Sequence, residues 1–357
     1  MSIFKSPLKL SIAVIAMLLG VSFLLPESAK AQPSEECGFG AAIQQFWSEE
    51  PAQRPTLQNE QIIGTTHFII HYTLTGPDAT TLAWAQAIAT DAEECWTAAT
   101  NLGWQLPPPD NGNGGDNRYD IYIFEVGFNG ITRPEASYPT PYSNGYSSWI
   151  ELRRDPIPNQ PISDLDRLKV LVAHEFHHAC QLRYTLLASN DFWFYENTSV
   201  LMEKVIYPQI NYLQYRLYIS NSPLLATGWA VNRQEDDYQY PGGLWALFLN
   251  EYYEDDAAVR KVWEYAGTNP AMGMLSVINS TLQAHYSSSL PEALKLYVVW
   301  RYFTGERADA YHFSDASLWP TSSIQATHSG YPVPSTQVLN KVDSPGGTSY
   351  VQFLTGQ

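Results

Sequence analysis

The sequence predicts an α+β fold, in which a β-rich N-terminal lobe precedes a mainly α-helical C-terminal lobe. Two observations support this prediction. Alternating apolar and polar residues occur before about residue 160, and apolar periodicities of helical spacing follow it. The chain has 357 residues, of which 45% are hydrophobic, so it can bury a large core and is not a disordered chain.

The N-terminal lobe is assigned to residues 32–160. Residues 32–64 contain few apolar anchors and are expected to form an irregular lead-in. Alternating or β-branched runs then predict strands, and an amphipathic run predicts one helix. The strands are expected at His67–Thr73, Tyr119–Val126 and Ser147–Arg153, and the helix at Ala79–Leu102.

The C-terminal lobe is assigned to residues 161–346, and a strand or tail at 347–357 follows it. Its first helix is expected to begin after Ser163, a favourable N-cap with Asp166 three residues later, and to reach about Leu187. Further helices are expected at Trp193–Ile206, Gly242–Tyr253, Ala257–Tyr265, Met272–Ala284 and Leu290–Phe303.

Residues 1–31 have the pattern of a signal peptide. Two lysines precede the apolar run Leu10–Leu25, and Ala29 and Ala31 supply the small residues of a cleavage site. The run is shorter than the ~20 residues that span a bilayer, which favours cleavage over an uncleaved anchor. We therefore expect a secreted protein, extracellular or periplasmic, that is not stably inserted in a membrane.

The net charge bears on the class of partner, and the cysteines bear on disulfide bonding. The chain has 20 Lys+Arg and 36 Asp+Glu, a net charge of −16, which argues against nucleic acid as a partner. The three cysteines are Cys37, Cys95 and Cys180. In an oxidising compartment one pair can form a disulfide. The pair Cys37 and Cys95 is favoured, while all three pairings stay open.

A metal-binding motif lies inside the first helix of the C-terminal lobe. His174 and His178 are four residues apart, so their imidazoles project from one helical face and can bind one Zn²⁺. Glu175 then lies beside the open position of the metal, where a carboxylate can act as general base and later as general acid. His177 points elsewhere and is expected either in the core or as a residue that supports a metal ligand. The alternative is a pair of core histidines with an ion-paired glutamate, which would leave two imidazoles needing partners.

A third ligand is expected from the next helix. Glu196 follows His178 by 18 positions and lies in the first turn of that helix, as a His₂Glu zinc site requires. Glu203, seven residues further on, returns to the same helical face. It is predicted to accept the free ring N–H of a ligating histidine, which fixes the orientation of that ring. An ordinary surface carboxylate is the alternative for Glu203.

With this motif and Glu196, the sequence resembles the gluzincins, which are zinc metallopeptidases with HExxH and a downstream glutamate. The metzincin pattern is excluded because Gln181 and Tyr184 occupy its glycine and third-histidine positions. The order of segments over residues 65–350 also resembles a family of secreted bacterial proteins that are predicted metallopeptidases. The shared segments are HFIIHYT, LGW, YDIY, HEFHH, WFYEN and WRYFTG.

The resemblance implies a zincin-like fold, with the active-site helix at a cleft between the lobes, and a secreted zinc-dependent endopeptidase. Gluzincins use a tyrosine or histidine of the helical lobe to stabilise the oxyanion. Tyr240, just before a Pro-Gly-Gly turn, is favoured for this role, and Tyr238 is second. By the same resemblance, the strand Ser147–Arg153 is expected to be the sheet edge on which an extended substrate pairs.

Two other functions stay open. One is a non-enzymatic secreted module that binds peptides or surfaces through a degenerate zinc peptidase site. The intact Glu175 argues against it, because a structural zinc site needs no general base. The other is metal-assisted hydrolysis of a non-peptide bond. For the peptidase, the substrate is a peptide or protein, and the acidity of the chain favours basic or neutral substrates over acidic ones.

Overall fold

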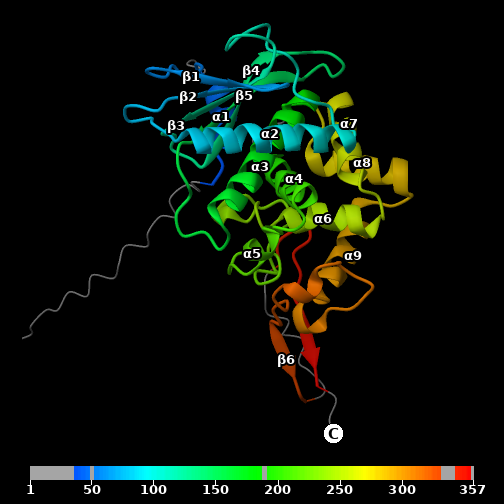
Figure 1. Ribbon diagram of the computed structural model, residues 1–357. Coiled ribbons are helices and arrows are strands. Elements are labelled where there is room, and N and C mark those ends of the chain that lie inside the picture. The colour runs from blue at the N-terminus through cyan, green and yellow to red at the C-terminus, as the bar shows by residue number, and fades with distance from the viewer. Residues whose placement is uncertain (1–35, 49–51, 187–190, 331–341, 355–357) are drawn as a thin grey trace, which may run out of the picture. The chain divides into compact units, whose positions relative to one another are not determined.

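A five-stranded mixed sheet forms one layer of the computed structural model, which describes residues 36–48, 52–186, 191–330 and 342–354 (Figure 1). The strands lie in the order β1-β2-β3-β5-β4. The three central strands are parallel, and the two edge strands are antiparallel to their neighbours. The strands are β1 (Gln61–Gly64), β2 (Phe68–Tyr72), β3 (Tyr119–Phe124), β4 (Gly130–Ser137) and β5 (Tyr146–Arg153).

The three predicted strands are confirmed as β2, β3 and β5, but the prediction that β5 is an edge is wrong. The edge on this side of the sheet is β4, which the sequence did not indicate because it begins at Gly130 and contains Pro134. Proline lacks an N–H group and is tolerated where no further strand pairs, so it suits an edge strand. β5 therefore lies between β3 and β4.

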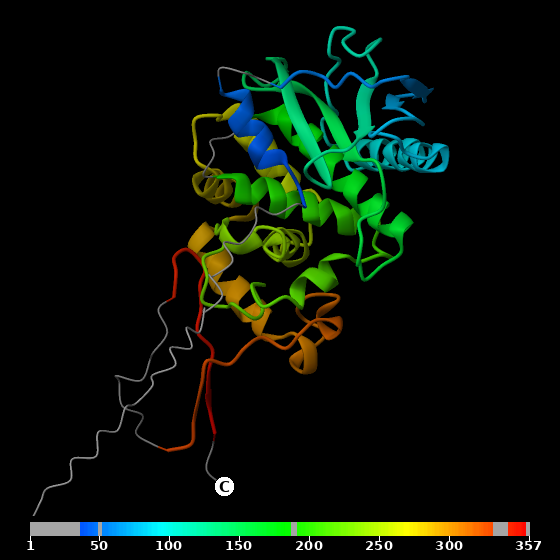
Figure 2. The ribbon, with the colours of Figure 1, turned by 90° about the vertical axis from the view of Figure 1, so that its left-hand side faces the viewer.

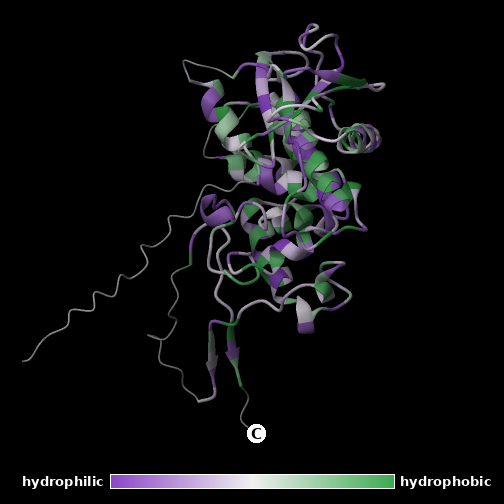
Figure 3. Cartoon of the chain, turned by 60° about the vertical axis from the view of Figure 1, so that its left-hand side comes forward, coloured by the Kyte–Doolittle hydropathy of each residue, from purple (hydrophilic) through white to green (hydrophobic). Residues whose placement is uncertain are grey.

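The two faces of the sheet differ in character. Alternate residues of the central strands, such as Ile70, Ile121 and Leu152, belong to the buried apolar core. Each such side chain contributes about 1.5–3 kcal/mol when it leaves water completely. The opposite face carries buried charges, among which Asp120 pairs with both Arg54 and His71. Figure 3 shows that the loops beyond this face are largely hydrophilic.

Helices make up most of the remaining elements, so the α+β class is confirmed. The α-helices are α1 (Phe39–Phe46), α2 (Leu82–Asn101), α3 (Asp164–Tyr184), α4 (Phe192–Ile206), α5 (Leu213–Leu217), α6 (Gly243–Tyr252), α7 (Ala258–Thr268), α8 (Met274–Tyr286) and α9 (Leu290–Tyr302). The short 3₁₀ helices are η2 (Glu235–Asp237), η3 (Gly305–Arg307) and η4 (Ala316–Leu318), and a small parallel pair is formed by β6 (Ala326–His328) and β7 (Val351–Phe353).

Most predicted elements agree with the structure to within a few residues. Ser163 caps α3 by accepting a hydrogen bond from the backbone N–H of Asp166, as predicted. The irregular lead-in predicted at 32–64 is wrong, since it contains α1 and β1. These elements have only eight and four residues, which is too short to give a clear periodicity. The signal peptide predicted at 1–31 lies outside the described residues.

The helix α3 occupies the centre of the compact unit that extends from Ser34 onward. It packs with α2 beneath the sheet, and α4 and then α6 follow on its other side (Figure 1). Sixteen of its 21 residues are buried, so its polar side chains must find partners inside the protein. The helix α1 lies along the edge strand β4 (Figure 2). Among the described residues, every helix is too short or too polar to cross a bilayer.

Candidate metal centre

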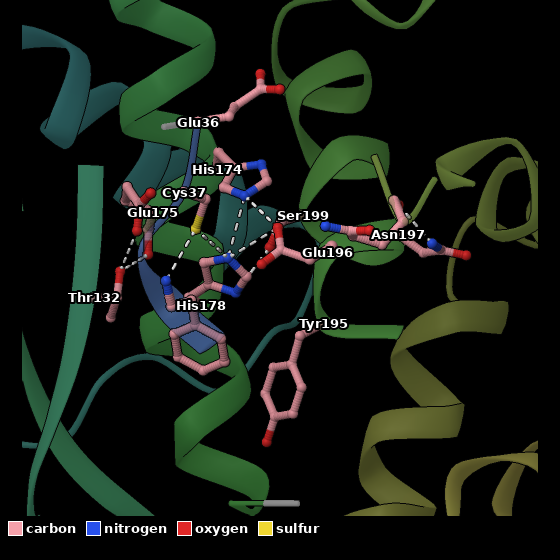
Figure 4. A network of polar contacts seen from close by, with 12 residues as sticks. Glu36, Cys37, Thr132, His174, Glu175, His178, Tyr195, Glu196, Asn197 and Ser199 are labelled. Atoms are coloured by element: carbon pink, nitrogen blue, oxygen red, sulfur yellow. Dashed lines mark hydrogen bonds and ion pairs between the residues drawn. The ribbon is translucent and has the colours of Figure 1, made fainter. Parts of the chain in front are cut away.

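The two helices α3 and α4 bring three predicted ligands to one point (Figure 4). His174 and His178 lie one turn apart on α3, and their Nε2 atoms are 3.2 Å apart. Glu196, in the first turns of α4, places Oε2 3.0 Å from Nε2 of His174 and 3.7 Å from Nε2 of His178. All three side chains are buried.

A fourth donor comes from an unexpected part of the chain. The Sγ atom of Cys37, just before α1, lies 3.4 Å from Nε2 of His178. The donor atoms of Cys37, His174, His178 and Glu196 all lie within 4.8 Å of one another. The sequence analysis missed this role because Cys37 precedes His178 by 141 positions and no local spacing links them.

The favoured disulfide between Cys37 and Cys95 is wrong. All three cysteines lie in the described part of the chain as buried free thiols. Cys95 contacts the hydroxyl of Tyr207 instead, with 3.8 Å between sulfur and oxygen. The pairing was favoured from the compartment and the count of cysteines, neither of which places two sulfur atoms in contact.

The donor set fits a zinc-sized ion. Ligands at about 2.0–2.3 Å from a tetrahedral zinc lie about 3.3–3.8 Å from one another. Four of the six donor pairs are 3.0–3.7 Å apart, and the two others, both involving Cys37, lie within 4.8 Å. Two imidazoles, a carboxylate and a thiol suit Zn²⁺, whereas Ca²⁺ and Mg²⁺ prefer oxygen ligands alone.

Each histidine is oriented by a contact on its other nitrogen. Nδ1 of His174 lies 2.7 Å from Oε1 of Glu203, which in turn accepts a hydrogen bond from Arg216 at 3.0 Å. Nδ1 of His178 lies 2.8 Å from Oε1 of Gln181. With Nδ1 donating to these oxygens, each Nε2 is left as the acceptor that a metal requires. The structure thus brings Glu203 to the site and adds Gln181, which the sequence analysis used only to exclude a class.

Glu175 lies between α3 and the edge strand. Thr132 of β4 donates a hydrogen bond to its Oε2 at 2.8 Å. The other oxygen, Oε1, is buried and accepts no hydrogen bond of ordinary geometry among the described residues, although the thiol of Cys37 lies close enough to Glu175 to interact with it. A Cβ atom added to Gly130 would lie 2.7 Å from Cγ of Glu175, so the glycine provides the space that this side chain occupies.

No protein-family model matches the chain, and no curated protein matches it. The gluzincin resemblance therefore depends on the motif residues, and the interpretation of the site depends on the contacts that His174, His178 and Glu196 make. The same contacts determine which of these side chains are protonated.

Three glutamates and two histidines share this buried space. Burial opposes the charged form of His174, but the neighbouring Glu196 and Glu203 outweigh it and raise the pKa of His174 to about 10. Burial also opposes the charged form of Glu196, yet His178 and His174 lower the pKa of Glu196 to about 2. Without a metal, a proton on His174 therefore balances the carboxylates. A bound divalent cation would supply that charge instead, and its binding would release the proton of His174.

The remaining predicted residues take different positions. Tyr240 lies just before α6, and its ring centroid is 6.1 Å from that of His174. It lines a cavity of about 330 Å³ together with Arg216 and Tyr212. Tyr238 is buried and packs against Trp229. The structure therefore places Tyr240, the first of the two predicted tyrosines, beside the site.

His177 lies in the core, which is one of the two alternatives that the sequence predicts. Its ring packs edge-on against Trp104, with 4.5 Å between the ring centroids. Burial, together with the charges of His178 and His174, lowers the pKa of His177 well below its usual value. His177 is therefore a neutral core residue that neighbours the site in sequence but does not join the donor set.

Proposed function

We propose that the protein is a secreted zinc-dependent endopeptidase of the gluzincin type. One observation carries this proposal: His174, His178 and Glu196 converge at one buried point, and Glu175 lies beside it with one carboxylate oxygen held and the other without a hydrogen bond of ordinary geometry. The signal-peptide pattern of residues 1–31 supports secretion.

The roles of the residues follow from their contacts. His174, His178 and Glu196 would hold Zn²⁺, which, when bound, supplies a Lewis acid that makes water more acidic and polarises a carbonyl group. Thr132 holds Oε2 of Glu175, so that Oε1 can accept a proton from water and later deliver it to the leaving amine. Tyr240 is assigned to donate a hydrogen bond to the carbonyl oxygen under attack.

The substrate would bind along the edge strand β4. An extended peptide can form backbone hydrogen bonds with the unpaired side of an edge strand, which gives affinity without dependence on sequence. The residue that begins β4, Gly130, lies against Glu175, and Thr132 two residues later contacts it. A peptide on this edge is therefore brought to the side of the site where the general base lies.

A non-enzymatic zinc module is the second candidate, and Cys37 favours it. Structural zinc sites are usually closed by four protein ligands, whereas catalytic sites keep one position open. With Cys37 the site offers four donors. The Oε1 atom of Glu175 favours the enzyme instead. A buried carboxylate oxygen without a hydrogen bond lowers the stability of the fold, which a purely structural zinc site would not require.

The two functions are separated by digesting a complex peptide library, with and without a chelator, and mapping the cleaved bonds. Both the full chain and Cys37→Ala are assayed, since Cys37 approaches the ligand set. We expect chelator-sensitive cleavage that Glu175→Gln lowers by about 10²–10⁴-fold while zinc stays bound. If neither protein cleaves any peptide, the peptidase proposal is wrong, and hydrolysis of a non-peptide bond or binding alone remains.

A further inference from the structure

The segment Glu36–Phe46, called the Cys37 segment below, contacts the site and its surroundings through three side chains. The first is Cys37, whose Sγ atom joins the donor set. This sulfur atom does not belong to α3 or α4, the two helices that supply the other three donors. It is thus the one donor whose position depends on a separate piece of chain.

The residue before Cys37 fills a charged pocket. Oε1 of Glu36 lies 3.1 Å from Arg167 and 2.7 Å from Arg216, measured to the guanidinium nitrogens. Both arginines are buried, and Arg216 also contacts Glu203, the partner of His174. Glu36 therefore anchors the segment to the residues that surround the site.

The segment also covers one ligand directly. The ring of Phe39 stacks on the ring of His178, with centroids 4.1 Å apart and planes within 2° of parallel. Phe39 is completely buried by this packing. The stacked ring covers one face of the His178 imidazole.

The backbone of the segment uses the edge strand. The N–H group of Gly38 donates to the carbonyl oxygen of Gly130 at 2.9 Å, and Cys37 and Gly130 form a parallel β-bridge. A Cβ atom at Gly38 would lie 2.6 Å from the side chain of Ile131 and 2.7 Å from that of Phe128, so a larger residue would have to displace these side chains. The segment therefore occupies the start of the strand edge that an extended substrate would need.

Resting on the proposed function, we infer that Cys37 is a fourth metal ligand that can be displaced, and that the Cys37 segment holds the peptidase in a latent state. The thiolate fills the position that a catalytic metal keeps open, and the segment blocks the start of the β4 edge. Displacement of the segment exposes the open metal position and the start of the β4 edge at the same time. A permanently closed site would leave Glu175 without a function.

The position of the segment in the chain makes displacement feasible. It precedes every strand of the main sheet, so one cut between Phe46 and Gln61 severs it from the rest of the fold. Trp47, directly after α1, is 63% exposed, and Ser48 is exposed as well. Exposed chain of this kind is accessible to proteases.

The inference is tested on the full chain with Co²⁺ in place of zinc, because a thiolate bound to Co²⁺ gives a near-ultraviolet charge-transfer band. Cys37→Ala is compared with Cys95→Ala, a control at another buried thiol that is not in the donor set. Metal content is measured by elemental analysis, folding by circular dichroism, and hydrolysis with the peptide library. Cys37→Ser replaces Cys37→Ala if the alanine variant does not fold.

We expect the band in the unmodified chain and in Cys95→Ala, and its loss in Cys37→Ala. The alanine variant should retain one metal ion per chain and hydrolyse peptides at least about tenfold faster, because the competent state no longer has to compete with thiolate binding. Persistence of the band in Cys37→Ala contradicts the ligand assignment. Loss of the metal along with the band contradicts displacement and indicates a structural four-ligand site.

The peptidase proposal can fail separately. If Cys37→Ala loses the band, keeps the metal and cleaves nothing, the peptidase function is wrong while the displaceable ligand stands. If instead it cleaves peptides at the same rate as the unmodified chain, the peptidase function stands and latency is wrong.

Discussion

Glu175 lies directly against Gly130, so closely that a Cβ atom on the glycine would stand 2.7 Å from Cγ and 2.8 Å from Oε1 of the glutamate. Real Cβ atoms do not approach carbon so closely, so any side chain at position 130 must move Glu175 or the strand. The contact couples the start of the edge strand to the proposed general base.

The first prediction follows from this contact. In the Cys37→Ala background, Gly130→Ala should lower hydrolysis about 10²-fold or more by displacing Glu175, while zinc content stays unchanged. Gly127→Ala is the matched control, because no described atom lies within 4 Å of the added Cβ. Peptidase rates and zinc content of the two variants are compared. Full activity in Gly130→Ala would show that Glu175 need not keep its observed position.

The second prediction separates neighbouring histidines of α3. His178→Ala should abolish stoichiometric zinc binding, since it removes a donor from a site that has few others. His177→Ala should retain zinc, because its ring packs against Trp104, although a cavity in the core should lower the free energy of unfolding by about 2–4 kcal/mol. Elemental analysis and urea unfolding distinguish the two effects. Stoichiometric zinc in His178→Ala would remove this residue from the ligand set.

Sequence reasoning reached the parts of the site that local geometry determines. The spacing of His174 and His178 places both side chains on one face of a helix, and Glu196 follows on the next helix. All three residues could therefore be predicted to lie together. Glu203 lies seven residues beyond Glu196 on the same helical face. Each of these relationships stays within one helix or between two consecutive helices.

The parts that escaped prediction depend on contacts between distant segments. Cys37 reaches the site only because the Cys37 segment pairs with the start of the edge strand, and no periodicity in the sequence indicates such a pairing. The order of β4 and β5 failed for a related reason, since β4 precedes β5 in the chain yet lies outside it in the sheet. Gly130 and Pro134 are unfavourable in strands, so the sequence did not predict β4. The same glycine leaves the space that the side chain of Glu175 occupies.

The third prediction concerns stability and pH at Asp91 of α2. Burial raises the pKa of Asp91 to about 6, although Lys169 opposes the rise from 2.9 Å. Since the unfolded value is about 3.9, the folded state binds this proton more tightly, and its contribution to stability is lost as the pH rises from about 4 to about 6. Asp91→Asn cannot lose a proton and should not show that loss.

This difference is measured by urea unfolding of both proteins at pH 4 and pH 7. The advantage of Asp91→Asn over the unmodified chain should grow by about 1–3 kcal/mol between the two pH values. Protonation of the metal ligands changes the free energy of unfolding of both proteins equally, so it does not affect the difference between them. A difference that is equal at both pH values would contradict the raised pKa.

The last prediction concerns substrate preference and follows from the pocket that Glu36 fills. The net charge of the chain favours basic or neutral substrates, but Arg216 lines the cavity beside the site and, together with Arg167, holds the Glu36 carboxylate there. Local charge within a few ångströms should outweigh the distant acidic surface, which salt screens over about 8–10 Å. Once the Cys37 segment is displaced, an acidic substrate side chain should take the place of Glu36.

Peptide pairs that differ only by glutamate or glutamine at one position near the cleaved bond test this preference in Cys37→Ala. At one position kcat/KM should be about tenfold higher for glutamate, as expected for a charge-assisted hydrogen bond of about 1.5–3 kcal/mol that competes with Glu36. Arg167→Gln should remove most of the discrimination. Arg167 is the better choice for substitution, because Arg216 also supports Glu203 and its loss would disturb the orientation of His174. Discrimination that survives in Arg167→Gln, or a preference for lysine at every position, would show that substrates do not use the Glu36 pocket.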